Sequence, residues 1–137
     1  MVDGPVEGVA PAPCSFALQT RAVERNGETG DVTLRMWAPV EWTNPHGTIQ
    51  GGFVAAMLDE VIGTPVFVKS GGAIAPLTLD LNSNFLRGLK PGEVIAKGRL
   101  VSMGRAIAFM EAELYDSDGQ LVATANAKAR LIPFAAD

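Results

Sequence analysis

The second half of the chain alternates apolar and polar residues at the period of a β-strand. Between residues 77 and 82, leucines occupy the odd positions and polar side chains the even ones, so the leucines would form one apolar face of a strand. Three further strand-like segments follow, separated by turns rich in Pro, Gly, Asp and Ser: residues 94–101, 106–115 and 121–132. The pattern predicts four successive long strands.

The first half of the chain contains two shorter apolar segments, residues 15–23 and 32–37. Between them lie Asn26 and Gly27, a pair that readily adopts the positive φ angles of a tight turn. This arrangement predicts an antiparallel hairpin. Residues 39–50 include two prolines and have neither a period of 2 nor one of 3.6, which predicts a long ordered loop.

One helix is predicted, and it begins at Gly51. Residues 53–62 are apolar apart from Asp59 and Glu60, which is typical of a helix that is apolar nearly all round and therefore buried. Pro65 removes a backbone hydrogen bond, so we expect it to kink or end the helix. The glycines at 71 and 72 close the segment.

Strands that follow one helix without strand–helix alternation favour an α+β fold. In such a fold an antiparallel sheet covers a long buried helix on one face. The 137 residues fit one domain. Residues 1–13 have no basic residue and no apolar run, so they lack a secretory signal and are expected to be a flexible leader before a single domain at 14–137.

The composition narrows the possible partners. With 47% hydrophobic and 19% charged residues, disorder is excluded, and apolar surface remains for a partner subunit. The net charge of −4 counts against a general nucleic-acid-binding function.

The single cysteine allows no internal disulfide and suggests no metal site. Asp59, Glu60 and Pro65 interrupt the apolar segment 51–68, so we do not expect this segment to span a membrane. A soluble cytoplasmic protein is expected.

Asp59 is the first candidate for chemistry. A carboxylate within an apolar helix costs several kcal/mol unless it is paired, hydrogen-bonded or near water. A functional role and a structural pairing are both open for it. The adjacent Glu60 points about 100° away around the helix, and we expect it to contact solvent or an interface.

Gly51 and Gly52 open the predicted helix and form the second candidate. Glycines at this position leave backbone N–H groups uncovered, and with the helix dipole these groups favour negative charge, such as a carbonyl oxygen that becomes an oxyanion. The alternative is that both glycines only let the helix pack closely on the sheet.

The separation of these candidates bears on assembly. The eight residues from Gly51 to Asp59 span about 12 Å at about 1.5 Å per residue, which is too far for both to reach one carbonyl group. Two antiparallel helices related by a twofold axis would place the start of one beside the middle of the other. This geometry predicts a homodimer with two shared sites.

The same residues carry a resemblance to a known family. The pattern has three parts. The first lies around the helix start and consists of Asn44, Gly47, Gln50, Gly51, Gly52 and Asp59. The second is the strand at 77–82, and the third is a C-terminal segment with Gly119, Leu121, Val122 and Ala123. It resembles the phenylacetate-pathway (PaaI-type) thioesterases of the hotdog superfamily over residues 30–132. The resemblance implies a hotdog fold, an antiparallel sheet wrapped around one long helix, and acyl-CoA thioester hydrolysis.

The resemblance also implies roles for individual residues. The N–H of Gly51 would bind the thioester oxygen, with Gly52 beside it in substrate binding, and Asn44 would place that oxygen or the attacking water. Asp59 from the opposite subunit would act as a base or as a nucleophile, assisted by the hydroxyl of Thr78.

One position departs from the family. Gln50 stands where a His usually precedes the paired glycines, so a neutral amide is the possible donor to the thioester carbonyl. His46 matches a variable position of the loop and is expected to be structural.

The family binds the phosphates of CoA with basic side chains at strand ends and turns. In this sequence Arg87, Lys90 and Arg105 occupy such positions. No cofactor or metal is implied, because a thioester is already activated and needs only a positioned water, a carboxylate and an oxyanion donor. A homodimer, with a dimer of dimers as the larger assembly, is expected, and the acyl group is left open.

The same residues bear on other possible functions. The chain has no Gly-x-Ser-x-Gly elbow and one histidine, which counts against a serine hydrolase, and His46 is not placed as in the dehydratase branch of the superfamily. A non-catalytic acyl-CoA-binding or acyl-sensing module on the same scaffold is the main alternative. A purely structural dimer would need no polar group at position 59.

Overall fold

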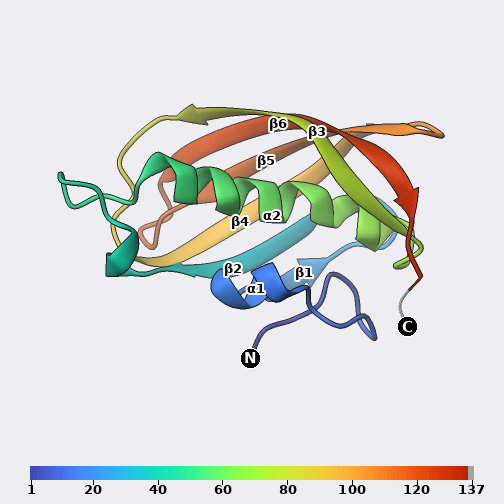
Figure 1. Ribbon diagram of the computed structural model, residues 1–137, viewed down its shortest axis with the longest axis horizontal. Coiled ribbons are helices and arrows are strands. Elements are labelled where there is room, and N and C mark those ends of the chain that lie inside the picture. The colour runs from blue at the N-terminus through green and yellow to red at the C-terminus, as the bar shows by residue number, and fades with distance from the viewer. Residues whose placement is uncertain (136–137) are drawn as a thin grey trace.

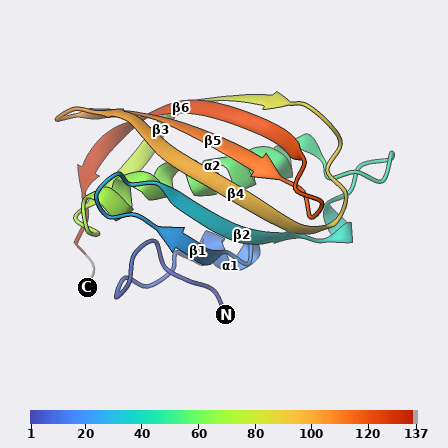
Figure 2. The same cartoon turned by 180° about the vertical axis from the view of Figure 1, so that it is seen from behind.

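The computed structural model describes residues 1–135 and shows an antiparallel sheet that curves around a long helix (Figures 1 and 2). The elements in chain order are α1 (Pro13–Ala17), β1 (Arg21–Arg25), β2 (Val32–Ala38), the 3-10 helix η1 (Val40–Trp42), α2 (Gly51–Lys69), β3 (Ile74–Phe85), β4 (Gly92–Met103), β5 (Ile107–Tyr115) and β6 (Leu121–Pro133). Within the described residues the strands form one six-stranded sheet in the order β1-β2-β4-β5-β6-β3, with antiparallel neighbours. The α+β prediction and the four long strands are confirmed. β1 and β2 form an antiparallel hairpin as predicted, but the positive φ in their connection is at Gly30 (+86°) and not at Asn26 or Gly27.

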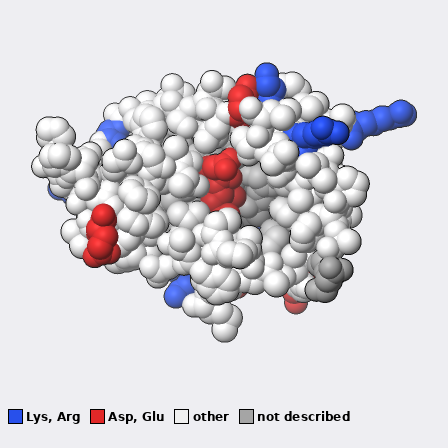
Figure 3. Space-filling model, viewed as in Figure 1, with Lys and Arg blue, Asp and Glu red and all other residues white. Residues whose placement is uncertain are grey.

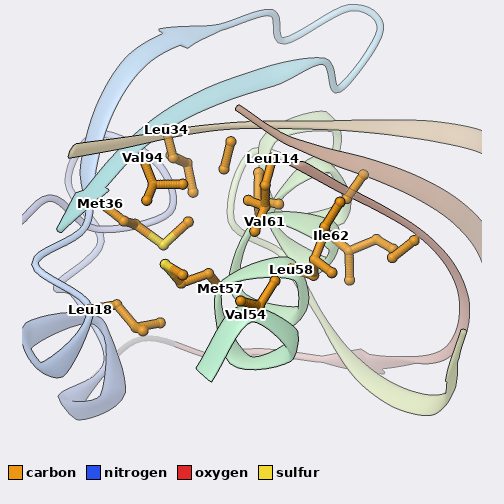
Figure 4. Packing of buried hydrophobic residues seen from close by; sticks show 14 of the residues in the cluster. Leu18, Leu34, Met36, Val54, Met57, Leu58, Val61, Ile62, Val94 and Leu114 are labelled. Carbon is orange, nitrogen blue, oxygen red and sulfur yellow. The ribbon is translucent and has the colours of Figure 1, made fainter. Parts of the chain in front are cut away.

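The inner face of the sheet packs on α2 because apolar residues alternate along its strands. In β5 every second residue is buried: Ala108, Met110, Ala112 and Leu114. The matching residues of α2 are also buried: Met57, Leu58, Val61 and Ile62. In Figure 4 Met57 of α2 and Met36 of β2 point toward each other. Burial of each large apolar side chain contributes about 1.5–3 kcal/mol, so this layer holds α2 in place.

Pro65 does not end α2, which continues to Lys69. Proline has no N–H to donate to the carbonyl of Val61, and β4 approaches closely there: a Cβ on Gly98 would lie 2.4 Å from the Val61 carbonyl oxygen. The hydroxyl of Thr64 donates to the carbonyl of Glu60, 2.9 Å away. Pro65 therefore does not end the helix, which packs closely against β4 at this point, while the kink stays a prediction.

The predicted burial of α2 holds for the side that faces the sheet. On the other side Gly52, Ala56 and Asp59 are exposed in the single chain. By length and composition, α2 is the one helix among residues 1–135 that could cross a membrane, with a mean hydropathy of 1.4. Half of it is buried inside the fold.

The N-terminal region differs from the predicted hairpin. Residues 15–17 belong to α1, and the first strand begins only at Arg21. Pro13 stands in the first turn of α1, where its fixed φ favours a helix. Within the leader, the N–H of Asp3 donates to the carbonyl of Thr20 at 3.0 Å, and a carboxylate oxygen of Asp3 accepts from the N–H of Ala22 at 2.7 Å. These bonds join the leader to β1, while its flexibility stays a prediction.

Candidate active site

A β-bulge in β3 decides which side chains of this strand face the helix. Thr78 pairs with Ala129 and Asp80 pairs with Lys128, so Leu79 is an extra residue between two ladder pairs. Ala129 is buried on the inner face and Lys128 is exposed. The prediction of one apolar face made by three leucines is therefore wrong, because the bulge shifts the alternation and turns Thr78 inward.

The inward turn of Thr78 brings its hydroxyl to Asp59. Oγ1 of Thr78 donates to Oδ1 of Asp59 at 2.9 Å. Asp59 is exposed in the single chain, so water and one hydroxyl stabilise its charge, and the desolvation that an apolar helix would impose is absent. Figure 3 views this open face: acidic side chains gather at its centre, over α2, beside a hollow.

The neighbouring carboxylate, Glu60, has a different partner. The hydroxyl of Thr20, itself buried, donates to Oε2 of Glu60 at 2.7 Å. We expected a contact with solvent or an interface, whereas the structure gives Glu60 a partner from the segment just before β1. Asp59 and Glu60 thus do not act as a pair.

The N-terminus of α2 leaves one backbone donor free. The side-chain oxygen of Gln50 accepts from the N–H of Gly52 at 2.8 Å, and the Gln50 carbonyl accepts from the N–H groups of Phe53 and Val54. The N–H of Gly51 has no hydrogen-bond partner within residues 1–135. An N–H at the positive end of a helix dipole is a donor for a developing negative charge.

Asn44 organises the loop that leads into α2. Its Oδ1 accepts from the N–H groups of His46 and Thr48, at 2.9 and 3.2 Å, and its Nδ2 donates to the hydroxyl of Thr48 at 3.0 Å. Gly47, in the same turn, has a φ of +78°, which favours glycine. The side chain of Asn44 is thus engaged in a tight turn, and His46 is an exposed loop residue.

An aromatic contact that the sequence did not reveal holds this loop to the helix. The rings of Trp42 and Phe53 stack at 4.7 Å between centroids, with 7° between their planes. The Trp42 carbonyl also accepts from the N–H of Gln50 at 2.8 Å. Phe53 belongs to the predicted helix and Trp42 to the predicted loop, so only the folded chain shows that their contact supports the start of α2.

A groove of about 320 Å³ lies beside the start of α2. Gly51 and Val54 border it on the helix side, and Phe85 and Leu86 border it at the end of β3. Arg87 also lines it and donates from Nη1 to Oε1 of Gln120 at 2.9 Å. The groove therefore joins the free donor of Gly51 to an apolar space.

A larger hollow, of about 700 Å³, lies on the outer face of the sheet. Charged side chains such as Lys97, Arg99 and Glu111 line it, and no candidate site residue does. The sheet separates this hollow from Asp59 and Gly51. The smaller groove is therefore the one that belongs to the candidate site, although the hollow is larger.

The other predicted basic residues do not gather at this groove. Lys90 is exposed in the connection between β3 and β4. Arg105 is in the turn between β4 and β5, at the opposite end of the sheet from the start of α2 (Figure 1). Within the described part of the chain, no group of three His, Cys, Asp or Glu side chains could hold a metal ion.

The match to a family model identifies the chain. The model of the thioesterase superfamily matches residues 46–123, which is more than half of the sequence. The chain belongs to the thioesterase superfamily. The matched segment of this superfamily member includes Gly51, Asp59 and Thr78, whereas Asn44 lies just outside it.

Individual relatives agree with this membership. A solved structure of a phenylacetic acid degradation-related protein from Ralstonia eutropha is 35% identical, with a TM-score of 0.82 and coverage of 90% of this chain and 93% of that one. Human acyl-coenzyme A thioesterase 13 is 27% identical over 96 residues, which are 69% of this chain and 68% of that protein. A Thermoplasma acidophilum protein described as an esterase is 29% identical over 75 residues, 55% of this chain, and only 57% of its length is covered. The predicted family, the hotdog fold and the class of enzyme, a thioester hydrolase, are confirmed.

Proposed function

We propose that this superfamily member hydrolyses an acyl- or aryl-CoA thioester to the free acid and CoA. The observation that carries the proposal is the hydrogen bond from Thr78 to Asp59, which orients a carboxylate on the open face of an apolar helix. The same helix begins with the free N–H of Gly51. A carboxylate and an oxyanion donor are the two groups that thioester hydrolysis requires, and the relationship to an acyl-coenzyme A thioesterase supports the substrate class.

The reaction can be written with these groups. A water oxygen attacks the thioester carbonyl carbon while Asp59 takes the proton of that water. The N–H of Gly51 stabilises the oxyanion of the tetrahedral intermediate. When the intermediate collapses, the carbon–sulfur bond breaks, and the thiolate of CoA leaves and takes up the proton. Direct attack by Asp59, through an acyl-enzyme anhydride that water then opens, gives the same products and is the other route.

Each site takes groups from two chains in this proposal. Gly51 and Asp59 lie about 12 Å apart along α2, because the rise of a helix is about 1.5 Å per residue. A reacting carbonyl must lie about 3 Å from its oxyanion donor and from the water that the base activates. Asp59 therefore serves a carbonyl held at Gly51 of a second chain, and a homodimer has two equivalent sites.

The edge of the sheet supports this assembly. β3 is a twelve-residue edge strand that carries Leu77 and Leu79 exposed in the single chain. A long apolar edge of this kind is a template for pairing with another chain. Antiparallel pairing of two β3 strands about a twofold axis also sets the two α2 helices antiparallel. A dimer of dimers is the expected larger assembly.

Gln50 and Asn44 complete the carbonyl site in this proposal. Because Oε1 of Gln50 caps Gly52, its Nε2 is directed elsewhere, and it has no protein partner in the described range of the chain. We assign Nε2 as a second donor to the thioester oxygen. Asn44 acts mainly by holding the turn that positions Gln50 and Gly51.

Basic side chains supply the contacts to the phosphates of CoA. Arg87 is the first of these, since it is exposed in the connection that follows β3. Lys90 follows in the same connection, and Arg105 of the partner subunit would approach from the far end of its own sheet, a placement that only the dimer permits. Each phosphate contact would be a charge-assisted hydrogen bond.

Thiol release tests the proposed function. The purified protein would be assayed with short, medium, long and aryl acyl-CoA, and we expect kcat/KM of about 10⁴ M⁻¹s⁻¹ or more for its best substrate. Tight binding of acyl-CoA without release of thiol would instead establish the non-catalytic binding or sensing module.

A further inference from the structure

Glu60 is the acidic residue of α2 to which the proposed reaction gives no role. Its side chain is half-buried, and its Oε2 accepts from the hydroxyl of Thr20 at 2.7 Å. A hydroxyl donor fixes the direction of a carboxylate but does not neutralise its charge. The hydrogen bond therefore holds a negative charge in a fixed place next to Asp59.

The position of Thr20 is itself fixed by its neighbours. Thr20 is only 5% exposed, its N–H donates to the carbonyl of Ser15 at 3.0 Å, and its carbonyl accepts from the N–H of Asp3 at 3.0 Å. The preceding residue, Gln19, has a φ of +52°, which residues with a side chain rarely adopt, and it turns the chain after α1. Three segments, the leader, α1 and α2, thus hold the donor that orients Glu60.

The carboxylates of the sheet have cationic partners, whereas those of α2 do not. Three ion pairs lie on the strands: Arg35 with Glu93, Arg99 with Glu111, and Lys128 with Asp80. Within residues 1–135, neither Asp59 nor Glu60 forms an ion pair. Figure 3 agrees, because the acidic side chains over α2 stand apart from the basic ones, which lie nearer the rim of this face. The open face of α2 is therefore negative where the proposed base lies.

The proposed reaction changes the charge of the group beside α2. The thioester carbonyl is neutral, but the acid formed from it loses its proton to water at neutral pH, which leaves a carboxylate on the same carbon atom. That carbon lies one water molecule away from Asp59, and Glu60 is the next residue, so its charge acts within roughly a Debye length, about 8 Å. The neutral substrate escapes this repulsion, and the anionic product does not.

We propose that Glu60 selects ligands of this site by their charge. Its carboxylate repels the product acid, and it also repels acyl groups that carry a carboxylate near the reacting carbonyl, whereas neutral acyl groups are accepted. The inference rests on the proposed function and deepens it by naming the charge of the acyl class. Glu60 takes no part in the proton transfer; it is a specificity-determining residue, and Thr20 is the residue that positions it.

Two CoA thioethers that differ only in charge test the proposal by calorimetry. S-carboxymethyl-CoA has a carboxylate one bond beyond the position of the thioester carbonyl, S-carbamoylmethyl-CoA has an uncharged amide of the same shape there, and neither can be hydrolysed as a thioester. Because both contain CoA, the contacts to its phosphates cancel in the ratio of the two Kd values. The wild-type protein should favour the amide by a factor of about 10², and Glu60→Gln should lower this ratio about tenfold.

Glu24→Gln is the matched control for the loss of charge. Glu24 is exposed on β1 and lines the hollow on the outer face of the sheet, so this variant should keep the wild-type ratio. Thr20→Val breaks the hydrogen bond but keeps the charge of Glu60, so the ratio should change less than in Glu60→Gln. An unchanged ratio in Glu60→Gln would overturn the proposal. An equal loss in Thr20→Val would also overturn it, because the hydrogen bond and not the charge would then decide.

Product inhibition links this selection to turnover. The free acid should inhibit thiol release weakly in the wild-type protein, and its inhibition constant should fall about tenfold in Glu60→Gln, while kcat/KM for a neutral acyl-CoA stays within about twofold. An unchanged inhibition constant would overturn the role in product release.

The thioether measurement separates this inference from the proposed function. If the ratio of Kd values responds to Glu60→Gln but no acyl-CoA is hydrolysed, the proposed function fails and the charge selection stands. If acyl-CoA is hydrolysed but the ratio does not respond, the charge selection fails and the function stands.

Discussion

At the scale of single residues, the proposed chemistry depends on Asp59 and on its hydrogen bond with Thr78. Asp59→Asn keeps the size of the side chain and an oxygen that accepts from Thr78, but it removes the base. Turnover should fall by a factor of about 10² or more while the assembly persists. Thiol release and size-exclusion chromatography measure the two quantities. A near-normal rate on the best substrate would contradict the role of Asp59.

The positioning role of Thr78 can be tested with a substitution that keeps the shape of its side chain. Thr78→Val removes the hydroxyl that orients Asp59, and we expect kcat to fall about tenfold, in keeping with one hydrogen bond to a charged group. The separate variant Thr78→Ser keeps the hydroxyl and should retain most of the wild-type kcat. Because Thr78 is exposed, thermal unfolding should change little in either variant. Equal rates for the Val and Ser variants would exclude the positioning role.

At the scale of elements, the start of α2 combines a helix cap with the carbonyl site. Gln50→Ala removes the acceptor for the N–H of Gly52 and should cost about 1 kcal/mol of stability. Its activity should fall less than that of Asp59→Asn, because the N–H of Gly51 remains to receive the oxyanion. Thermal unfolding and thiol release measure both effects. Equal, near-total losses would mean that Gln50 is essential to the chemistry or to the loop.

Gln50→Glu is the variant that separates capping from catalysis. It keeps a side-chain oxygen for Gly52, and its negative charge suits a helix N-terminus, so stability should be maintained. The Nε2 donor is lost, and a carboxylate stands near the developing oxyanion, so activity should fall below that of Gln50→Ala. An active Gln50→Glu protein would show that position 50 only caps the helix.

At the scale of the whole molecule, the assembly should be a condition for activity. Chains with Asp59→Asn keep an intact carbonyl site, and chains with Asn44→Ala and Gly51→Pro keep an intact carboxylate. Proline is tolerated in the first turn of a helix and deletes the proposed N–H donor. Co-refolding the two inactive proteins should regenerate one working site per mixed dimer.

The measurement is thiol release after co-refolding, with mass spectrometry to verify heterodimers. Each parent refolded alone is the matched control. Heterodimers that stay as inactive as their parents would show that Asp59 works with donors of its own chain.

The sequence by itself determined most of the elements and indicated the residues that we propose for the chemistry. The helix from Gly51, the strands of the second half and the turn at Asn26 follow from local preferences, because periodic burial and turn residues act within a few positions. The same locality explains the free N–H of Gly51, which every helix start provides unless a cap takes it. The resemblance added Asp59 and Thr78 as partners, which their hydrogen bond now joins.

Only the tertiary structure decided how these elements meet. Contacts with β4 keep α2 helical through Pro65, against its local preference. The bulge at Leu79 turns Thr78 toward α2, although the alternation of the sequence had placed that residue on the opposite face from the leucines. The groove at Phe85 exists because an edge strand passes the start of a helix. Strand register and the close approach of strands to the helix are set by residues far apart in the chain, so a local sequence pattern cannot predict them.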